Sequence, residues 1–409
     1  MSESNAAGHV PPARKNYDVV IIGGAMMGAS LAWFLASNDA FNGSILVVER
    51  DPTYEFSSTY RSAAGIRQQF SSELNVRISQ FGAQFIDNLR SFLGDDPRVP
   101  EVPIRNIGYM YLAGDEAGVE RLKYAHGVQQ KAGAATRLMR PEEIAEAYPF
   151  YNLDGVLLGS HNTVGEGTWD PVTVHDWWKR IARERGAEFI HNEAVALDLS
   201  QDGTRVDAVH LASGESVACG TVINAAGTRA ASVAGMAGIT IPVEPRKRFA
   251  YVFKAEQPLS KPLPLTIDTS GVYCRQDGSD TYLAGGHTEP DGPSAIDDFS
   301  MDHGLWMDRI WPAIATRIPQ FEAVRVIAEW CGHYAYNMLD QNAIAGPHPH
   351  VRNFIFMNGF SGHGVQQSPA MGRGIAELIV HGEYRSLDLT PFHFDRVLSG
   401  TPYPESAII

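Results

Sequence analysis

The residues of this chain that could do chemistry gather in glycine-rich segments, and the first of these follows the earliest strand-like run. Residues 19–22 are four consecutive β-branched residues, a pattern typical of a buried strand in a parallel sheet. They lead into the sequence GGAMMG, which comprises Gly23, Gly24, Ala25, Met26, Met27 and Gly28. The outer glycines of such a turn allow a tight bend and close packing of helix on strand, and the amides of a helix N-terminus bind phosphate. The arrangement predicts a site for the pyrophosphate of a dinucleotide.

A carboxylate follows this turn at a distance that suits the same ligand. Glu49 ends the strand-like run SILVVE 21 residues after Gly28, where an acidic side chain accepts both ribose hydroxyls and repels a 2′-phosphate. The middle fingerprint position is Ala25 rather than glycine, which adds a methyl group where backbone and phosphate nearly touch. The alternative is a glycine-rich turn in an ordinary α/β protein. Strand, helix-like run and spaced acid together favour the dinucleotide site.

The loop after the second strand is rich in small polar residues. Residues 51–70 read DPTYEFSSTYRSAAGIRQQF, which is too polar and irregular for a core. Hydroxyl groups here would donate hydrogen bonds to oxygens of a phosphate or a cofactor ring, whereas the alternative is a solvated turn. We expect this region to bind the cofactor through Arg50, Ser57, Ser58, Thr59, Ser62, Ala63, Ala64 and Gly65.

Two further strand-like runs end in glycine-rich turns. TVINAAG ends in Ala225, Ala226 and Gly227, and NFIFMN leads into Gly359, Phe360, Ser361, Gly362, His363, Gly364, Val365 and Gln366. The carboxyl ends of parallel strands meet at one edge of a sheet, so we expect both turns beside the first one. Val195, in the run NEAVALDL, is expected to cradle the adenine ring. Nicotinamide enzymes do not need the C-terminal glycine-rich loop, so the combination favours FAD.

Composition indicates the class of protein and excludes some partners. The chain has 409 residues, 44% hydrophobic and 20% charged, as expected of a soluble globular protein large enough for two lobes. A net charge of −14 argues against nucleic acid or an anionic membrane surface as a partner. Cys219, Cys274 and Cys331 have no C-x-x-C spacing, so we expect no disulfide framework and no metal site, and a cytoplasmic location fits. No apolar run is long enough for a transmembrane helix.

The patterns predict a Rossmann-type α/β lobe for the cofactor and an α+β second lobe, with a mixed, largely antiparallel sheet, for the substrate. Residues 1–16 lack the apolar core of a signal peptide and are expected to form a flexible leader. The cofactor lobe is expected to comprise residues 17–94, 155–240 and 331–395. The substrate lobe is expected to comprise residues 95–154 and 241–330, the latter because hydrophobic and polar residues alternate there. Residues 396–409 are predicted to be a C-terminal tail.

The motifs DVVIIGG, VINAAG and GFSGHGVQQSPAMGRG, together with Glu49, resemble those of the D-amino-acid oxidase superfamily of flavoproteins. The resemblance lies in the branch with monomeric sarcosine oxidase, the enzymes that oxidise sarcosine and dimethylglycine, and glycine oxidase. Within this branch, FSGHGVQQSPA and the closing ESAII are most similar to the FAD-dependent oxidoreductase domain-containing protein 1 group. The resemblance spans nearly the whole chain from Tyr17. It implies an FAD lobe built from three chain segments and a substrate lobe with a large mixed sheet.

The same resemblance implies a reaction. Members of the superfamily oxidise an amino acid or an N-substituted amino acid by hydride transfer from the carbon next to nitrogen to flavin N5, and the imine is then hydrolysed. The implied partners are an amino-acid-like small molecule and either oxygen or an electron-transfer acceptor, and the oligomeric state is open. Two alternatives remain at this point. One is a 2-hydroxy acid dehydrogenase on the same fold, and the other is a flavin-bearing assembly factor for a respiratory complex.

Carried over residue by residue, the resemblance assigns Arg67 to the substrate carboxylate, which a planar guanidinium captures with two hydrogen bonds. Gln366 stands where sarcosine oxidases have a lysine that helps to hold this carboxylate. Leu283 lies near the position of a second lysine, which is associated with oxygen activation. The cysteine that binds flavin covalently aligns with Gly332, one residue beyond Cys331. The resemblance therefore implies non-covalent FAD.

Other residues are candidates for the pocket wall. These are His287, Tyr334, Tyr336 and His363, each of which could instead be a packed side chain. His287 and Tyr336 are expected to touch the substrate, and His363, inside the glycine-rich loop, is expected to touch the flavin. The basic run at residues 246–248 is expected to form a strand face that solvent reaches, and the alternative is an entry for anionic substrates or for an acceptor protein.

Overall fold

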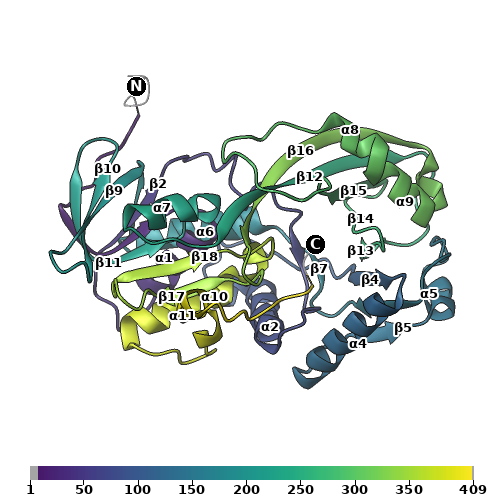
Figure 1. The fold of residues 1–409 in the computed structure, drawn as a ribbon, viewed down its shortest axis with the longest axis horizontal. Helices are drawn as coiled ribbons and strands as arrows, with labels where there is room; N and C mark the ends of the chain where they lie inside the picture. Colours follow the sequence, from purple (N-terminus) through teal and green to yellow (C-terminus); the bar gives the residue numbers. More distant parts are fainter. Residues whose placement is uncertain (1–7, 408–409) are drawn as a thin grey trace.

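The fold has two lobes, each built on an eight-stranded sheet (Figure 1). The computed structural model describes residues 8–407. The two architectures confirm the predicted fold class, a Rossmann-type α/β lobe beside a lobe with a mixed, largely antiparallel sheet. Within residues 8–407, no helix combines the length and the apolar character that crossing a membrane requires.

The sheet of the first lobe has a parallel centre. In spatial order its strands are β17 (Ile344–Pro347), β18 (Phe354–Asn358), β11 (Ser216–Asn224), β1 (Asn16–Ile22), β2 (Ile45–Glu49) and β8 (Glu188–His191). Only β17 is antiparallel along this path. A ribbon of β9 (Ala194–Leu199) and β10 (Val206–Leu211) pairs with β11. The carboxyl ends of β1, β2, β11 and β18 therefore lie at one edge of the sheet.

Helices cover both faces of this sheet, which explains the unbroken apolar run in β1. Val19 and Ile21 pack into a core with helices α1 (Met26–Ala36), α2 (Glu73–Asp87), α6 (Pro171–Glu184) and α10 (Gly364–His381). Val20 and Ile22 pack into a second core with α7 (Ala230–Met236). The short α3 (Leu89–Phe92) and α11 (Asp395–Ser399) complete the lobe. Because both faces are buried, alternation of apolar and polar residues is absent, as predicted.

The second lobe is a mixed sheet in which most strands are antiparallel. Its strands follow the order β16 (Val324–Asn337), β12 (Val243–Ala255), β15 (Thr281–Gly286), β14 (Tyr273–Gln276), β13 (Leu265–Ile267), β4 (Tyr109–Ala113), β6 (Leu158–Asn162) and β5 (Arg137–Met139). Its helices are α4 (Glu116–Lys131), α5 (Pro141–Ala147), α8 (His303–Leu305) and α9 (Trp311–Arg317). A two-stranded pair, β3 (Gly65–Ile66) and β7 (Gly167–Thr168), lies apart from both large sheets.

Sheet membership moves two of the predicted lobe boundaries. β6 pairs with β4 and β5, so the second sheet extends beyond the boundary expected at residue 155. β16 pairs with β12 as far as Asn337, so the boundary expected at residue 331 falls inside a strand. The hydrogen-bond partners of β6 and β16, rather than their position in the chain, decide to which sheet each strand belongs.

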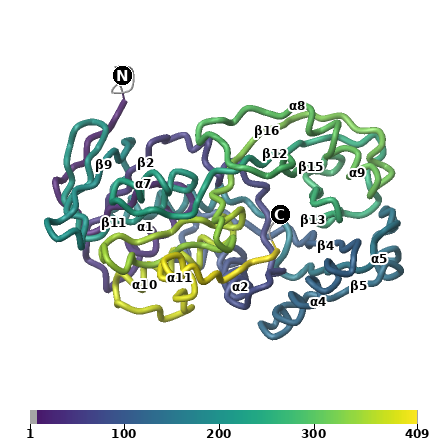
Figure 2. The backbone as a smooth tube through the Cα atoms, viewed as in Figure 1, coloured from purple at the N-terminus to yellow at the C-terminus, as the bar shows by residue number. Residues whose placement is uncertain are grey.

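The C-terminal segment is packed against the first lobe, contrary to the prediction of a tail at residues 396–409. Arg396 is buried, and its Nε lies 2.6 Å from Oδ2 of buried Asp340. Beyond α11 the chain passes the start of α2 and ends its described course between the lobes (Figure 2). The partners of Arg396 lie far away in sequence, so no local pattern in this segment indicates the packing.

The described part of the predicted leader, residues 8–15, lies along β8. The amide of Val10 donates to the carbonyl of His191 over 2.8 Å, and the amide of Ala13 donates to Oε1 of Glu188 over 2.7 Å. The prediction of a flexible leader is therefore wrong for this part. Residues 1–7 of the leader lie outside the described residues.

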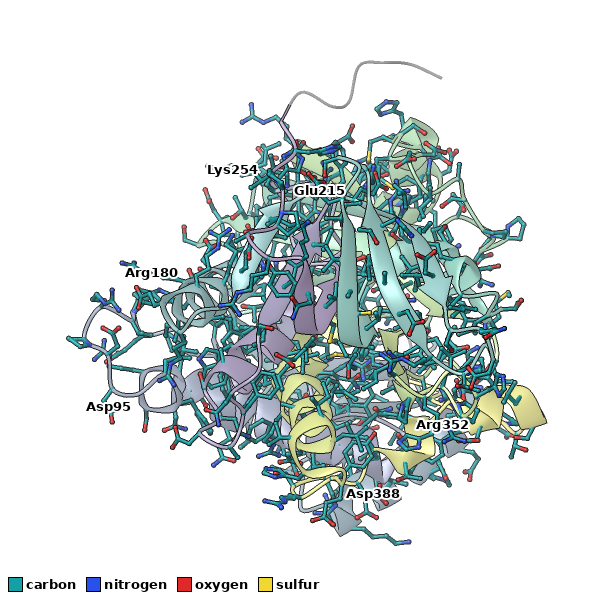
Figure 3. The ribbon with its side chains drawn as sticks, turned by 90° about the vertical axis from the view of Figure 1, so that its left-hand side faces the viewer. Asp95, Arg180, Glu215, Lys254, Arg352 and Asp388 are labelled. Carbon is teal, nitrogen blue, oxygen red and sulfur yellow. The ribbon has the colours of Figure 1, made fainter. Side chains whose placement is uncertain are left out.

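We expect Arg396→Ala to lower the free energy of unfolding by about 3 kcal/mol, because removing one member of a buried ion pair leaves the other charge uncompensated. Denaturation in urea, followed by circular dichroism, measures this change. Arg352→Ala is the matched control, since Arg352 is exposed on the first lobe (Figure 3). Equal midpoints for the two variants would contradict the prediction.

Candidate functional site

A cavity of about 920 Å³ lies between the lobes, and residues of both lobes line it. The carboxyl ends of β1, β2 and β11 contribute Gly23, Glu49 and Ala225. The second lobe contributes Arg248 from β12 and Tyr334 from β16. The glycine-rich turns that the sequence predicted to meet thus lie in one wall, facing the second lobe.

Most residues predicted to bind the cofactor line this cavity, and the assignment of that role to them stays a prediction. They are Gly23, Ala25, Met26, Met27, Glu49, Arg50, Ser57, Ser58, Thr59, Ser62, Ala63, Gly65, Ala225, Ala226, Gly227, Phe360, Ser361, Gly362, His363, Gly364, Val365 and Gln366. Arg67, predicted to bind the substrate, lines it as well.

Four of the predicted residues, Gly24, Gly28, Ala64 and Gly359, lie behind the cavity wall and shape it. A Cβ at Gly28 would lie 1.9 Å from the carbonyl oxygen of Gly23, so only glycine lets α1 approach the turn. Gly359 has φ +70° and lies against the side chain of Asn337. These residues set the path of the backbone and need not touch a ligand.

Three predicted residues lie outside the cavity. Val195 is 49% exposed, because its neighbour Ala194 occupies the inward position of β9 and lines the cavity instead. Nδ1 of His287 lies 2.9 Å from the carbonyl oxygen of Thr288, just beyond the end of β15. The ring of Tyr336 is covered by the guanidinium of Arg246, at 3.8 Å. None of these three residues belongs to the cavity wall, where contact with adenine or substrate was predicted.

The nucleotide end of the cavity has the shape that a pyrophosphate and a ribose require. A Cβ at Gly23 would lie 2.5 Å from the carbonyl oxygen of Ala225, so the turns after β1 and β11 touch. Oε2 of Glu49 accepts the amide of Gly24, and Oε1 accepts the amide of Asp51, each over 2.8 Å. Burial raises the pKa of Glu49, while these two amides oppose the rise. Each carboxylate oxygen keeps a lone pair for a ribose hydroxyl.

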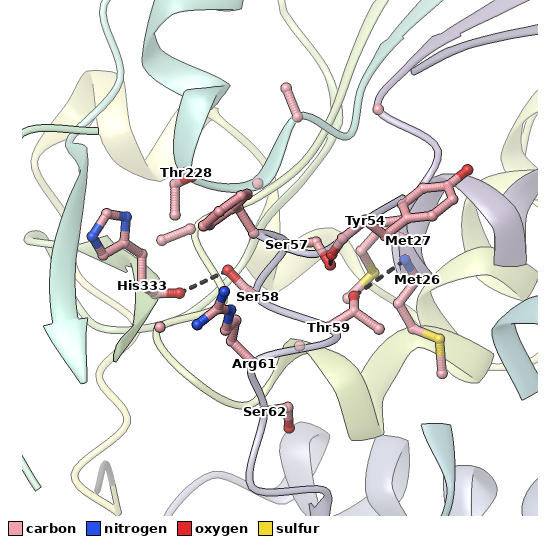
Figure 4. Close-up of a pocket in the computed structure, with 18 of the residues that line it drawn as sticks. Met26, Met27, Tyr54, Ser57, Ser58, Thr59, Arg61, Ser62, Thr228 and His333 are labelled. Carbon is pink, nitrogen blue, oxygen red and sulfur yellow. Dashed lines mark hydrogen bonds between the residues drawn. The ribbon is translucent and has the colours of Figure 1, made fainter. Parts of the chain in front are cut away.

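The polar loop after β2 is tied to both lobes (Figure 4). The hydroxyl of Ser58 donates to the carbonyl of His333 in the second lobe over 2.7 Å, and Thr59 Oγ1 accepts the amide of Met26 over 3.4 Å. The hydroxyl of Ser57 donates to the carbonyl of Tyr54 over 2.7 Å. The hydroxyls of Ser57 and Ser58, expected to donate to a cofactor, donate to backbone carbonyls instead. Ser57, Ser58 and Thr59 all line the cavity, and their contacts with a cofactor stay a prediction.

Sequence reasoning missed two aromatic residues behind the first turn. Nε2 of His175 lies 2.9 Å from the carbonyl oxygen of Gly24, and burial lowers the pKa of His175 to about 4. Tyr54 packs edge-on against this imidazole, at 4.6 Å between ring centroids. Neither residue belongs to a motif, so only the fold could bring them to the turn that holds Glu49.

Arg248 corrects the expectation that the basic run at residues 246–248 faces solvent. It is buried and lines the cavity, and its guanidinium makes two bonds to Asp291, of 2.9 and 3.0 Å. Lys247 points to the other face of β12, where its Nζ lies 2.6 Å from Asp298. Strand alternation separates these cations, and Asp291 balances the charge of Arg248.

Arg67 supplies a buried positive charge to the other end of the cavity. Its side chain is 3% exposed and lies over the ring of Phe70, at 3.9 Å from the ring centroid. The guanidinium donates to the carbonyls of Gln69 and Ala407. Among residues 8–407, no carboxylate oxygen lies within 4.0 Å of it. A buried cation without a counter-ion is costly, so this end of the cavity favours an anionic ligand.

His363 and Gln366 flank Arg67. Oε1 of Gln366 accepts the backbone amide of Arg67 over 2.8 Å. Within the described chain, neither ring nitrogen of buried His363 has a hydrogen-bond partner. Burial, helped by the charge of Arg67, lowers the pKa of His363 to about 3. A neutral imidazole with unused nitrogens in a cavity wall indicates a ligand that completes its hydrogen bonds.

The three cysteines lie away from the cavity wall. Cys331 packs in the core of the second lobe, and its neighbour Gly332 lines the cavity, where a Cβ would lie 2.9 Å from Cβ of Arg61. Leu283 is buried beside Tyr109 and Leu265, and no lysine lines the cavity within residues 8–407. Non-covalent attachment of FAD stays a prediction.

Comparison with known proteins decides the family. The model of the family described as FAD dependent oxidoreductase matches residues 18–378. The chain belongs to this family. FAD-dependent oxidoreductase domain-containing protein 1 of Xenopus laevis is 38% identical over 98% of this chain and 86% of its own length. These findings confirm the resemblance seen in the sequence.

Two other relatives are more distant. Mitochondrial sarcosine dehydrogenase of Mus musculus is 26% identical over 96% of this chain, which spans 43% of that protein. The crystal structure of L-proline dehydrogenase from P. horikoshii superposes with a TM-score of 0.81 at 26% identity, covering 94% of this chain and 99% of that one. The protein is therefore an FAD-dependent oxidoreductase. The turns around Gly23 and the carboxylate of Glu49 fit the nucleotide part of FAD.

We expect Gly28→Ala to reduce the FAD content of the purified protein by about tenfold or more, because the added methyl group collides with the carbonyl of Gly23 and displaces α1 from the turn. Flavin absorbance per mole of protein measures the loss, and circular dichroism reports folding. Gly235→Ala is the control, since a Cβ there meets nothing within 4 Å. A folded Gly28→Ala variant with full FAD would refute this role of the glycine.

We expect His363 to make the protein sensitive to acid. Burial lowers the pKa of His363 from 6.5 to about 3 in the folded protein. Between these two pH values the imidazole is protonated in the unfolded chain and neutral in the folded one, so acid favours unfolding. Stability is lost as pH falls below 6.5, by about 2 kcal/mol at pH 5 for this one group. The melting temperature of His363→Gln measured at pH 7 and pH 5 should fall less than that of the wild type. Equal falls would contradict the buried neutral state.

Proposed function

We propose that this enzyme oxidises the carbon next to nitrogen in an amino acid or an N-substituted amino acid whose carboxylate is bound by Arg67. The observation that carries the proposal is the buried guanidinium of Arg67, which has no carboxylate within 4.0 Å among residues 8–407 and opens onto the same cavity as Glu49. Sarcosine and proline, which the relatives named above oxidise by their names, each combine one carboxylate with a secondary amine.

The charges around the cavity support a substrate with one carboxylate and a neutral amine. Asp291 balances Arg248, and His363 is uncharged, so Arg67 supplies the positive charge at this end that no described carboxylate contacts within 4.0 Å. Tyr109, Leu265 and Tyr273 add an aromatic and apolar wall that keeps water from the reacting carbon.

FAD, when bound, supplies the oxidant by accepting the two electrons and the hydrogen of the broken C–H bond. The protein's part is to hold and orient the substrate. Arg67 grips the carboxylate, Gln366 steadies the backbone of Arg67, and the unpartnered nitrogens of His363 lie in the wall beside them. The imine product is then hydrolysed by water.

Among residues 8–407, His363 is the base that lines the cavity beside Arg67, whereas Glu166 lies behind the wall and accepts bonds from Gln69 and Asn162. This arrangement favours an amine over a 2-hydroxy acid. An alcohol must lose its hydroxyl proton as it is oxidised, whereas a neutral amine has a lone pair and needs no base. With a pKa of about 3, His363 is too weak a base for the alcohol. A flavin-bearing assembly factor would not need an unpaired buried cation in the wall, which favours catalysis over that alternative.

We also propose an electron acceptor and a cellular compartment for this enzyme. Because no lysine among the described residues lines the cavity, we favour an electron-transfer acceptor over oxygen. The buried free cysteines support a reducing compartment such as the cytoplasm, although the mouse sarcosine dehydrogenase is mitochondrial by its name.

The test is anaerobic bleaching of the flavin absorbance by sarcosine, dimethylglycine, proline, N-substituted dicarboxylic amino acids and 2-hydroxy acids. We expect an amine to bleach the wild type, and Arg67→Ala to raise the concentration that gives half the maximal rate by about 100-fold, because the charge-assisted bonds to its carboxylate are lost. Arg180→Ala, on the exposed face of α6, is the control (Figure 3).

Bleaching by a 2-hydroxy acid alone would favour the alternative reaction. An Arg67→Ala variant as active as the wild type would refute the role of Arg67 as the carboxylate clamp. The rate of reoxidation on admitting air then distinguishes an oxidase from a dehydrogenase.

A further inference from the structure

The C-terminal segment Tyr403–Ala407 reaches the guanidinium of Arg67. We propose that Glu405 is a positioning residue of the substrate site, because it fixes the segment whose last described carbonyl, that of Ala407, holds Arg67. The inference rests on the proposed function, since it takes Arg67 as the group that binds a carboxylate. It adds a part of the chain that the sequence predicted to be a tail.

Glu405 is an unusually well-bonded buried carboxylate. It is 1% exposed and lies at the start of α2, where its two oxygens accept the amides and hydroxyls of Ser71 and Ser72 over 2.5–3.2 Å. Asn75 adds a bond of 2.9 Å from its side-chain amide. An anion at a helix N-terminus is stabilised by the unpaired amides and by the helix dipole. These bonds fill the hydrogen-bonding capacity of the carboxylate, so its role is to anchor the chain.

The chain on either side of Glu405 is held as firmly. Upstream, Tyr403 donates its amide to Asp340 over 3.0 Å, and its carbonyl accepts the side-chain amide of Asn342 over 2.7 Å. Downstream, the amide of Ser406 donates to the hydroxyl of Ser71 over 2.9 Å, and the amide of Ala407 donates back to Glu405 over 3.0 Å. The position of the Ala407 carbonyl therefore follows from the position of Glu405.

The guanidinium of Arg67 is oriented by two carbonyls that come from different parts of the chain. Nη1 donates to the carbonyl of Gln69 over 2.8 Å, and the side chain of Gln69 is fixed by Glu166 and Ser160, each over 2.8 Å. Nη2 donates to the carbonyl of Ala407, whose amide is bonded to Glu405. Carbonyls hold a guanidinium in place without cancelling its charge, whereas a carboxylate in the same place would compete with the substrate. The C-terminal segment thus orients the cation and leaves it available.

The test compares binding of benzoate and benzamide to the FAD-loaded protein, read from the change in visible flavin absorbance. Neither probe carries an amine that can be oxidised, and they differ in the charge that Arg67 recognises. In Glu405→Gln, one carboxylate oxygen becomes an NH₂ group. This group cannot accept the hydrogen bonds that Ser71 and Ser72 donate, so we expect the C-terminal segment to shift away from Arg67. We expect Kd for benzoate to rise about tenfold and Kd for benzamide to stay within about twofold.

Two further variants keep the test decisive. Ser71→Ala removes one hydroxyl that bonds both Glu405 and Ser406, and we expect a rise of about threefold in Kd for benzoate if Glu405→Gln fails to fold. Glu383→Gln is the control, because Glu383 is exposed and its carboxylate lies 3.6 Å from Arg385 on the surface.

The outcomes separate this inference from the proposed function. A wild type that prefers benzoate, with variants that lower the melting temperature but keep the same preference, would overturn the positioning role of Glu405 alone. A wild type without any preference for benzoate over benzamide would refute the carboxylate clamp at Arg67, and with it both proposals.

Discussion

The close approach of the turns after β1 and β11 is the constraint on which the rest of the site depends. Gly23 lies so near the carbonyl of Ala225 that a single Cβ would come within 2.5 Å of it, and Gly28 lies as tightly against the first turn. These contacts place the start of α1 beside the carboxyl ends of three parallel strands. Glu49, at the end of β2, then reaches the same turn and bonds the amide of Gly24. A dinucleotide site follows from backbone packing more than from any side chain.

Two buried arginines line the cavity, and they differ in whether a carboxylate pairs with them. Arg248 comes from β12 already paired with Asp291, so it stabilises the wall without attracting a second anion. Arg67 is held by carbonyls and by the ring of Phe70, and within residues 8–407 no carboxylate contacts it directly. Because the protein interior screens charge weakly, this difference supports our proposal that the substrate group at Arg67 is anionic.

Features that depend on local pattern could be predicted from the sequence. The buried strand of residues 19–22 and the glycine-rich turns follow from composition and period, and the meeting of three strand ends follows from the geometry of parallel sheets. Features that depend on which segment covers a face could not. Val195 lies outside the cavity because neighbouring residues of β9 point to opposite faces of the strand. The burial of Arg248 could not be predicted because strand alternation does not reveal which face is covered. Glu405 finds Ser71 at a separation of 334 residues, a contact that no local pattern indicates.

A crystal structure of the FAD-loaded protein with benzoate would test the assignment of the two ends of the cavity most directly. We expect FAD to be bound without a covalent link, with its nucleotide part at Gly23 and Glu49. We expect the benzoate carboxylate to lie within hydrogen-bond distance of the Arg67 guanidinium. A flavin ring sealed from any open cavity, or benzoate bound away from Arg67, would contradict this assignment.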